Sequence, residues 1–173
     1  MWEIDYDEAA SIWIDKEKKS VHMEKDALKE KIDEYIKLHN TGALAVSVGD
    51  FVRCTPIEYN YVDNCVYLFS EGGLKFRALK HNKHVAFAIY EPYGGFQHLK
   101  SLQIMGTASM VEPFTDEYLK IMKVKKIPVE TMKKLSQPMN LIKIVPENYD
   151  YLDSDLKSEG FGSRQHLGVE SEE

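Results

Sequence analysis

The spacing of apolar residues in the first forty positions predicts helices. Four apolar residues recur at helical spacing among charged ones: Leu28, Ile32, Tyr35 and Ile36. This spacing is typical of an amphipathic helix, and the Asn-Thr-Gly sequence at residues 40–42 would end it. A shorter helix is expected around residues 6–13, followed by a charged linker at residues 16–19.

The pattern changes to strands between residues 41 and 113. Five runs rich in β-branched and aromatic residues are separated by turn signals: 43–48, 51–62, 65–69, 85–90 and 101–111. One short helix, at residues 74–82, interrupts them. Because strands joined by short turns favour antiparallel pairing, we expect an antiparallel sheet or a small barrel and not a parallel βαβ arrangement.

Alternation along these strands assigns side chains to two faces of the sheet. In the last run, four residues are expected inside a barrel: Leu102, Ile104, Ala108 and Met110. In the second run, Arg53 and Thr55 share one face. Cys54 and Pro56 lie on the other, and because Pro56 cannot donate a ladder hydrogen bond, this strand is expected to be edge-like or bulged.

The last third of the chain returns to helices and then to strands. Helices are expected at residues 115–127 and 129–137, and strands at 140–146 and 148–152. The residues after 152 are polar and acidic, as in a frayed tail. We therefore predict one domain over residues 1–173, with helices in 1–40, the barrel core in 41–113, helices and the last strands in 114–152, and a tail in 153–173.

Composition and charge narrow the class of protein. Of the 173 residues, 43% are hydrophobic, which is ordinary for a globular chain. The net charge of −6 argues against nucleic acid as a partner. No apolar run approaches the ~20 residues that a membrane span requires, and the N-terminus lacks the pattern of a secretion signal. We therefore expect a cytoplasmic protein with no nucleic-acid or membrane partner.

Familiar catalytic and metal-binding patterns are missing from the sequence. There is no GxSxG, HExxH, Walker A or GxGxxG motif. His81 and His84 share the end of a predicted helix, where a solvated helix end explains them better than a metal pair. Cys54 and Cys65 lie at opposite ends of a predicted hairpin, so no disulfide is expected. We predict no metal site.

One stretch has the composition of a phosphate site. SEGGLKFRAL, which begins at Ser70, follows a strand and places two glycines before a helix that carries Lys75 and Arg77. A helix N-terminus presents unpaired N–H groups, and a hairpin over residues 51–69 would bring Arg53 back towards Ser70. Two interpretations stay open: a phosphate cradle, and a turn with basic residues that balance the acidic surface.

The order and spacing of these runs resemble a known family. The segment ALAVSVGDFVRCTPIEYNYVDNCVYLFSEGGLKFRALKHNKHVAFAIYEP, followed by SLQIMGTASMVEP, resembles the pyridoxamine 5′-phosphate oxidase-like family, the FMN-binding split β-barrels. The chain looks more like the nitroimidazole-reductase-like and uncharacterised branches than like the vitamin B6 enzyme. The resemblance implies a mainly β (α+β) fold, a six-stranded antiparallel split β-barrel with flanking helices. It also implies a homodimer with two FMN sites at the subunit interface.

The resemblance further implies which residues hold the FMN. On the second strand, an arginine and the residues after it would meet the flavin and its phosphate: Arg53, Cys54, Thr55 and Pro56. The end of the third strand and the following helix would add Phe69, Ser70, Lys75 and Phe76. The fifth strand would supply Lys100, Ser101 and Gln103.

Three departures separate the chain from true pyridoxamine phosphate oxidases. Phe76 stands where those enzymes have the second cation of an Arg-Lys pair, and Glu58 stands where they have a lysine. Glu58 is either a charge partner for a basic residue of the site or an exposed residue on an edge strand. The sequence Arg164-Gln165-His166 matches their substrate-binding Arg-x-His, but it falls in the predicted tail and is interpreted as a coincidence.

The expected activity is FMN-dependent electron or hydride transfer between a nicotinamide donor and a small acceptor. Tyr93 and His98, in the loop before the fifth strand, would line the substrate side. The first alternative is a flavin-binding electron carrier or sensor without turnover of its own. The second is a haem-binding or haem-degrading split barrel, in which His98 or His166 would bind iron. The deazaflavin F420 is a further alternative cofactor, and the sequence specifies neither the substrate nor the electron donor.

Overall fold

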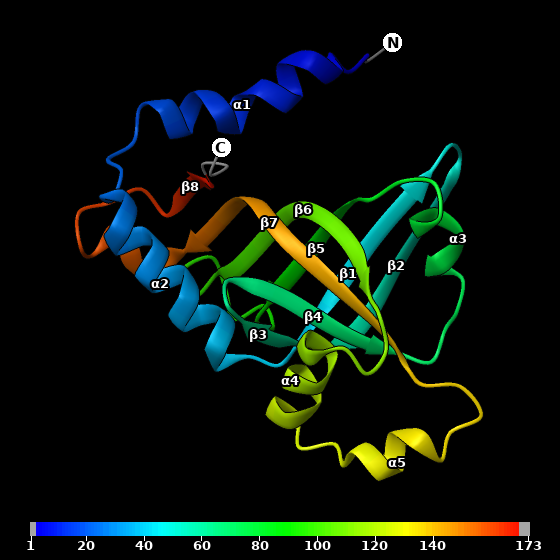
Figure 1. Cartoon of the computed structure of the whole chain (residues 1–173). Coiled ribbons are helices and arrows are strands. Elements are labelled where there is room, and N and C mark those ends of the chain that lie inside the picture. Colours follow the sequence, from blue (N-terminus) through cyan, green and yellow to red (C-terminus); the bar gives the residue numbers. More distant parts are fainter. Residues whose placement is uncertain (1–2, 170–173) are drawn as a thin grey trace.

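The computed structural model describes residues 3–169 of the chain. One curled antiparallel sheet forms a barrel with helices around it (Figure 1). The helices in the described part are α1 (Tyr6–Lys18), α2 (Lys25–Leu38), α3 (Lys75–Leu79), α4 (Asp116–Val124), α5 (Val129–Lys133) and the 3-10 turn η1 (Ser154–Lys157). The strands are β1 (Thr41–Val48), β2 (Phe51–Glu58), β3 (Asn60–Val62), β4 (Cys65–Ser70), β5 (His84–Tyr90), β6 (Lys100–Val111), β7 (Asn140–Asp153) and β8 (Arg164–Gly168).

The strands follow the order β2-β1-β5-β6-β7-β4-β3, and β8 pairs with β7 beside this path. Every pair is antiparallel. The predicted class, an antiparallel split barrel with flanking helices, is therefore confirmed. Over residues 3–169 the sheet has eight strands where six were expected, because one predicted strand divides in two and the predicted tail adds another.

The divided strand breaks at Tyr59, where the chain passes from one edge of the sheet to the other. β2 pairs with β1, whereas β3 pairs with β4 at the far end of the strand order. Tyr59 is buried, and its hydroxyl donates to the Ile36 carbonyl at 2.5 Å. The expected hairpin over residues 51–69 is therefore wrong in its first half, because Tyr59 anchors in the core and redirects the chain. The second half forms and turns at Asp63-Asn64.

The barrel interior holds the main apolar core. The stripe predicted on α2 is buried: Leu28, Ile32, Tyr35 and Ile36. Three of the residues expected inside from β6 are also buried: Leu102, Ile104 and Ala108. Met110 is 45% exposed, because Val111 takes the buried position at that end of β6. A second apolar cluster joins β4 and β7 to α4 and α5.

The predicted tail contains a strand. β8 pairs with β7 over residues 164–168, so the expectation of a loose tail is wrong there, and residues 170–173 lie outside the described part. Gln165 explains the order of this segment. Its side chain is buried, donates to the Val21 carbonyl at 3.1 Å and accepts from the Met23 N–H at 3.0 Å. It thereby ties β8 to the segment between α1 and α2.

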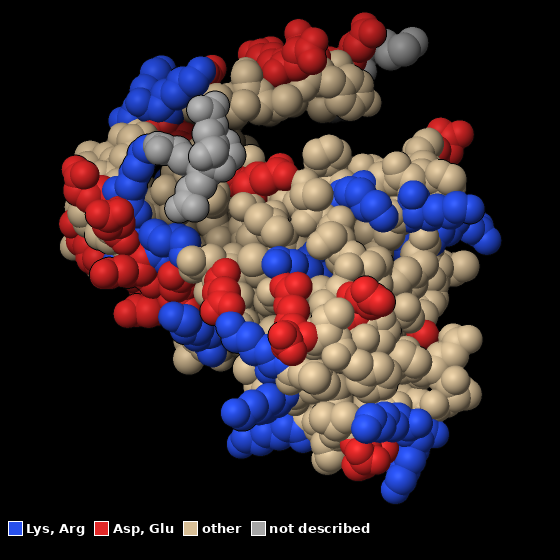
Figure 2. All heavy atoms as spheres, viewed as in Figure 1, with Lys and Arg blue, Asp and Glu red and all other residues tan. Residues whose placement is uncertain are grey.

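The first helix is longer than predicted and stands apart from the barrel (Figures 1 and 2). α1 runs to Lys18, so the expected linker at residues 16–19 is mostly helical. Asp5 caps it by accepting hydrogen bonds from the N–H groups of Asp7 and Glu8 at 3.0 and 2.9 Å. Lys16 and Lys18 lie in its last turn, where cations favour the helix dipole. Among residues 3–169, no helix is long and apolar enough to cross a membrane.

A close approach of β6 to β7 generates a stability prediction. The register between the two strands shifts at Met105/Gly106, and a Cβ on Gly106 would overlap the backbone carbonyl of Val145. We expect Gly106→Ala to destabilise the protein by about 1–3 kcal/mol, the usual range for overpacking. Urea denaturation measures the change. Gly94→Ala is the matched control, because its Cβ would meet only ordinary contacts, and equal effects of both substitutions would contradict the prediction.

Candidate functional site

The turn after β4 is held by the side chain of Ser70. The Ser70 hydroxyl donates to the Gly72 carbonyl at 3.0 Å and accepts from the Gly72 N–H at 3.2 Å. Gly73 has φ +110°, a conformation that residues with a Cβ rarely adopt. The two glycines therefore let the chain turn sharply from β4 into α3, with the hydroxyl of Ser70 at the base of the turn.

Lys75 is the unusual residue of this turn, because it is a buried cation. Its side chain is only 6% exposed, and its Nζ donates to the same Gly72 carbonyl at 2.6 Å. Burial lowers the pKa of Lys75, and the nearby positive charge of Arg53 lowers it further. In the described part of the chain, neither Lys75 nor Arg53 forms an ion pair with a carboxylate. Lys75 is thus a buried charge without a counterion, which is unfavourable, and together with the exposed Arg53 nearby it suits a bound anion.

The curl of the sheet brings Arg53 to this place. Arg53 lies opposite Val46 on the face of β2 that also carries Thr55. β2 is not hydrogen-bonded to β4. β2 is the first strand in the strand order, and β4 is the last but one, with only the short β3 after it. Arg53 and Lys75 therefore meet across the closure of the barrel and not within a hairpin. Ser70 and Lys75 donate to the same Gly72 carbonyl, and Arg53 lies close enough to Lys75 for its charge to lower the pKa of that lysine.

The other predicted residues near this turn have different surroundings. Cys54 and Pro56 lie on the outer face of β2, opposite to Arg53, and both are exposed. Phe69 packs into the second apolar cluster, with its ring edge-on to Tyr118 at 5.5 Å. Phe76 lies beside the barrel core, and its ring centroid is 5.4 Å from the Nζ of Lys75.

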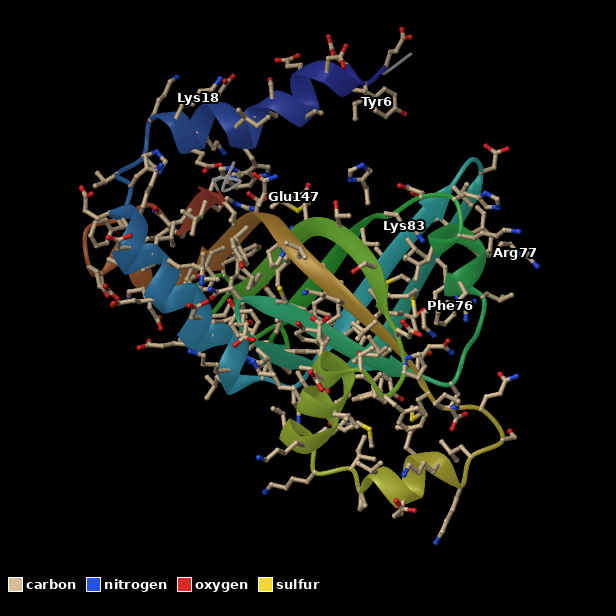
Figure 3. The ribbon with its side chains drawn as sticks, viewed as in Figure 1. Tyr6, Lys18, Phe76, Arg77, Lys83 and Glu147 are labelled. Carbon is tan, nitrogen blue, oxygen red and sulfur yellow. The ribbon has the colours of Figure 1, made fainter. Side chains whose placement is uncertain are left out.

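α3 is short, and its second basic residue, Arg77, lies near Phe51. The helix has five residues, so its N-terminus adds little to an anion site and the side chains carry the charge. Arg77 is exposed, with its guanidinium carbon 5.6 Å from the ring centroid of Phe51. Phe76 and Arg77 both project from α3 at the edge of the barrel (Figure 3). Glu58 is not a partner for this cluster, since it forms an ion pair with Lys125.

The predicted residues of β6 lie apart from this cluster. β1 and β5 separate β2 from β6, and Gln103 shares the outer face with Pro56. Ser101 and Gln103 line a cavity of about 200 Å³ beneath α1. Lys100 is already paired, at 2.8 Å from Asp155, and the hydrogen bond between them raises the pKa of Lys100. Within one chain, the β6 residues and the Arg53–Lys75 cluster do not form one site.

Tyr93 and His98 lie in the exposed loop between β5 and β6. The Tyr93 ring is edge-on to Phe96, with centroids 6.0 Å apart. Ser154 holds the loop, because its hydroxyl donates to the Phe96 carbonyl and accepts from the Leu99 N–H, both at 3.1 Å. Their proposed role on the substrate side stays a prediction, since no contact links this loop to Lys75 among the described residues.

Sequence reasoning missed the place of Arg164 and His166. Arg164 lines the cavity beneath α1 together with Ser101 and Gln103, and its guanidinium carbon lies 4.3 Å from the Trp13 ring centroid. His166 is held by Asp150, with 2.7 Å between Nδ1 and Oδ1. The alternation of buried Gln165 and Leu167 with these two residues was the available signal for a strand. It was obscured by the flanking glycines.

Comparison with known proteins gives matches among solved structures. No family model matches the sequence, and no curated protein matches it either. A FAD-binding protein from Mesorhizobium loti has a TM-score of 0.57 at 19% identity, covering 70% of this chain and 89% of that one. A candidate pyridoxamine 5′-phosphate oxidase from Listeria innocua has a TM-score of 0.58 at 24% identity, covering 72% and 98%.

The same fold also occurs in a haem protein. The haem storage protein HutZ from Vibrio cholerae matches with a TM-score of 0.58 at 18% identity, covering 69% of this chain and 90% of that one. The structures that resemble this chain are therefore flavin-binding and pyridoxamine 5′-phosphate oxidase-like split barrels, together with haem proteins. At these identities the likeness establishes the fold.

The buried ammonium of Lys75 generates a pH-dependent stability prediction. Its pKa is lower in the folded protein than its ordinary value of 10.5, so protonation of Lys75 opposes folding. This penalty is complete at pH values below the folded pKa and disappears as the pH rises above the unfolded value. We expect Lys75→Met to stabilise the ligand-free protein at pH 7 by roughly 0.5–2 kcal/mol, the range typical of relieved strain at functional sites.

Urea denaturation at pH 7 and at high pH tests this expectation. The gain from Lys75→Met should shrink at high pH, where lysine is neutral in both states. The Gly72 carbonyl keeps its hydrogen bond from Ser70, so the substitution leaves no acceptor unpaired. Lys37→Met, at an exposed position of α2, is the control and should change little. A loss of stability in Lys75→Met at pH 7 would contradict the conclusion that the buried charge of Lys75 opposes folding.

Proposed function

We propose that this chain is a cytoplasmic, homodimeric, FMN-dependent oxidoreductase that acts between a nicotinamide donor and a small acceptor. The observation that carries the proposal is the buried Lys75, which has Arg53 beside it and no carboxylate partner within residues 3–169. Two cations match the needs of a phosphate monoester. The flavin-binding and oxidase-like neighbours with the same fold support this choice of phosphate ligand.

In this proposal, the residues of the chain hold and orient the cofactor. Lys75 and Arg53 would neutralise the phosphate of FMN, and Ser70 would hold the turn in place through its hydrogen bonds to Gly72. Phe76 would offer an apolar surface next to the charged group. Bound FMN would supply the electron-transfer chemistry, so the chain needs no acid–base pair of its own. This agrees with the absence of catalytic motifs in the sequence.

A second copy of the chain is part of the proposal because the middle of the outer face, on β2, β1 and β5, carries small apolar side chains. One row across four strands reads Pro56, Ala43, Ala88 and Gln103. A solvated face of an antiparallel sheet usually carries polar side chains, whereas small apolar ones suit the close approach of another sheet. A homodimer built on this face would let Ser101 and Gln103 of one copy serve the cluster of the other.

Haem binding is the second candidate. HutZ, which shares the fold, is a haem storage protein. In this chain His166 is held through Nδ1 by Asp150, an arrangement that orients many metal-binding histidines. A flavin-binding electron carrier without turnover is the remaining alternative to an enzyme.

The visible spectrum of the purified protein, as isolated and after addition of FMN or haem, tests the cofactor. We expect flavin absorption, and bleaching on addition of NADH or NADPH without oxygen. A Soret band in place of flavin absorption would select haem. Flavin that binds but is not bleached by either nicotinamide would select the electron carrier. Protein that takes up no FMN would refute the main proposal.

Substitution of the two cations tests the phosphate assignment. We expect Arg53→Ala and Lys75→Ala each to weaken FMN binding by about 1.5–3 kcal/mol, the value of a charge-assisted hydrogen bond. Riboflavin lacks the phosphate, so its affinity should change much less. Fluorescence titration measures both ligands. Lys37→Ala is the matched control, and equal losses for FMN and riboflavin would place the two cations away from the phosphate.

A further inference from the structure

α1 carries apolar side chains that its own barrel leaves uncovered. None of residues 6–18 is buried, and Tyr6, Trp13 and Ile14 are 77%, 53% and 54% exposed. Tyr6 projects from the helix over the open space between α1 and the barrel (Figure 3). An isolated helix of 13 residues is marginal in water. α1 therefore needs another surface to be stable.

Within residues 3–169, the first half of α1 forms no hydrogen bond, ion pair or ring contact with its own barrel. The contacts between α1 and the barrel come from its second half, where Trp13 stacks on Arg164. In the described chain, residues 3–10 form hydrogen bonds only within their own helix and its cap, and no ion pair or ring contact joins them to the barrel.

The exposed area of the chain is larger than a monomer of its size requires. The chain exposes 11490 Å², whereas a monomeric protein of 19.9 kDa is expected to expose about 8,700 Å². The excess of roughly 2,800 Å² exceeds the ~800 Å² that each partner buries in an interface of standard size. The exposed area of the chain is thus sufficient for a stable dimer.

The charges of the first half of α1 indicate which surface of a second copy it would contact. Residues 3–8 contain four carboxylates and no basic residue: Glu3, Asp5, Asp7 and Glu8. Residues 72–90 contain no carboxylate and four basic residues: Lys75, Arg77, Lys80 and Lys83. Arg77 and Lys80 are exposed and form no ion pair in the described part. The acidic side of α1 faces away from its own barrel (Figure 2), where a second molecule can reach it.

We propose that α1 is an arm that packs on a second copy of this chain, with the carboxylates of residues 3–8 against the second copy's basic edge at Arg77 and Lys80. This inference rests on the homodimer proposed above. The same contact removes part of the exposed area of α1 from water, whereas Tyr6 lies on the side of the helix that faces its own barrel. Because a symmetric dimer uses the same patch twice, two arms and two basic edges pair at once.

Charge reversal with mixing tests the arm. The arm variant is Asp7→Lys with Glu8→Lys, and the edge variant is Arg77→Glu with Lys80→Glu. Each alone places like charges against each other in its own homodimer, so its dimer dissociation constant should rise about tenfold or more. Sedimentation equilibrium measures it. A control variant, Lys37→Glu with Lys134→Glu, reverses two exposed charges outside the proposed contact and should behave like the wild type.

An equimolar mixture of the two variants separates an exchanged arm from one that closes on its own barrel. In the mixed dimer every reversed arm meets a reversed edge, so mixing should restore dimer formation to within about threefold of the wild type. If the arm binds its own barrel, mixing does not restore the dimer, and only a chain that carries all four substitutions forms it. That result would overturn the inference. Wild-type levels of dimer in both separate variants also overturn it. A monomeric wild type would refute the homodimer itself, whatever the variants do.

Discussion

The burial of Tyr59 determines where the sheet has its edges. Its side chain enters the core between the end of α2 and the ring of Phe87, with 5.4 Å between the two ring centroids. At this residue the chain leaves β2 at one edge of the sheet and begins β3 at the other edge. The sheet must then curl so that the loop after β4 returns to β2. The closeness of Arg53 to Lys75 follows from this closure, although Arg53 lies on β2 and Lys75 on α3, far apart along the strand order.

Some basic and acidic side chains form ion pairs within the described chain, and others do not. Lys100, Lys125 and Lys143 all have carboxylates nearby. Lys75, Arg53 and Arg77 have none in the described chain, and the carboxylates of residues 3–8 form no ion pair there either, whereas Asp15 of α1 pairs with Lys18. Exposed lysines such as Lys37 also lack an ion pair in the described part, so the unusual feature of Lys75 is that it lacks one while buried.

The sequence predicted the fold class well and the connections less well. Alternation found the strands and the α2 stripe, because local side-chain periodicity reports burial directly. It could not show that Tyr59 turns inward, since a buried tyrosine with a hydroxyl partner looks like any strand aromatic. The strand of Arg164 was hidden for a similar reason: Gln165 is polar, and only its long-range hydrogen bonds to Val21 and Met23 make it a core residue. Arg53 does lie near Lys75, but the hairpin over residues 51–69 that was expected to bring the two residues together does not form.

The hydrogen bonds of the turn at Ser70 also affect how much conformational entropy a ligand would cost on binding there. Lys75 has three N–H donors, and the Gly72 carbonyl uses one of them. Ser70 fixes that same carbonyl from the other side, so the lysine is already held in place while two donors stay free. A ligand that arrives here meets an ordered ammonium group and does not have to organise the loop first. Little conformational entropy is then lost on binding, and the shape of this turn should be the same with and without its ligand.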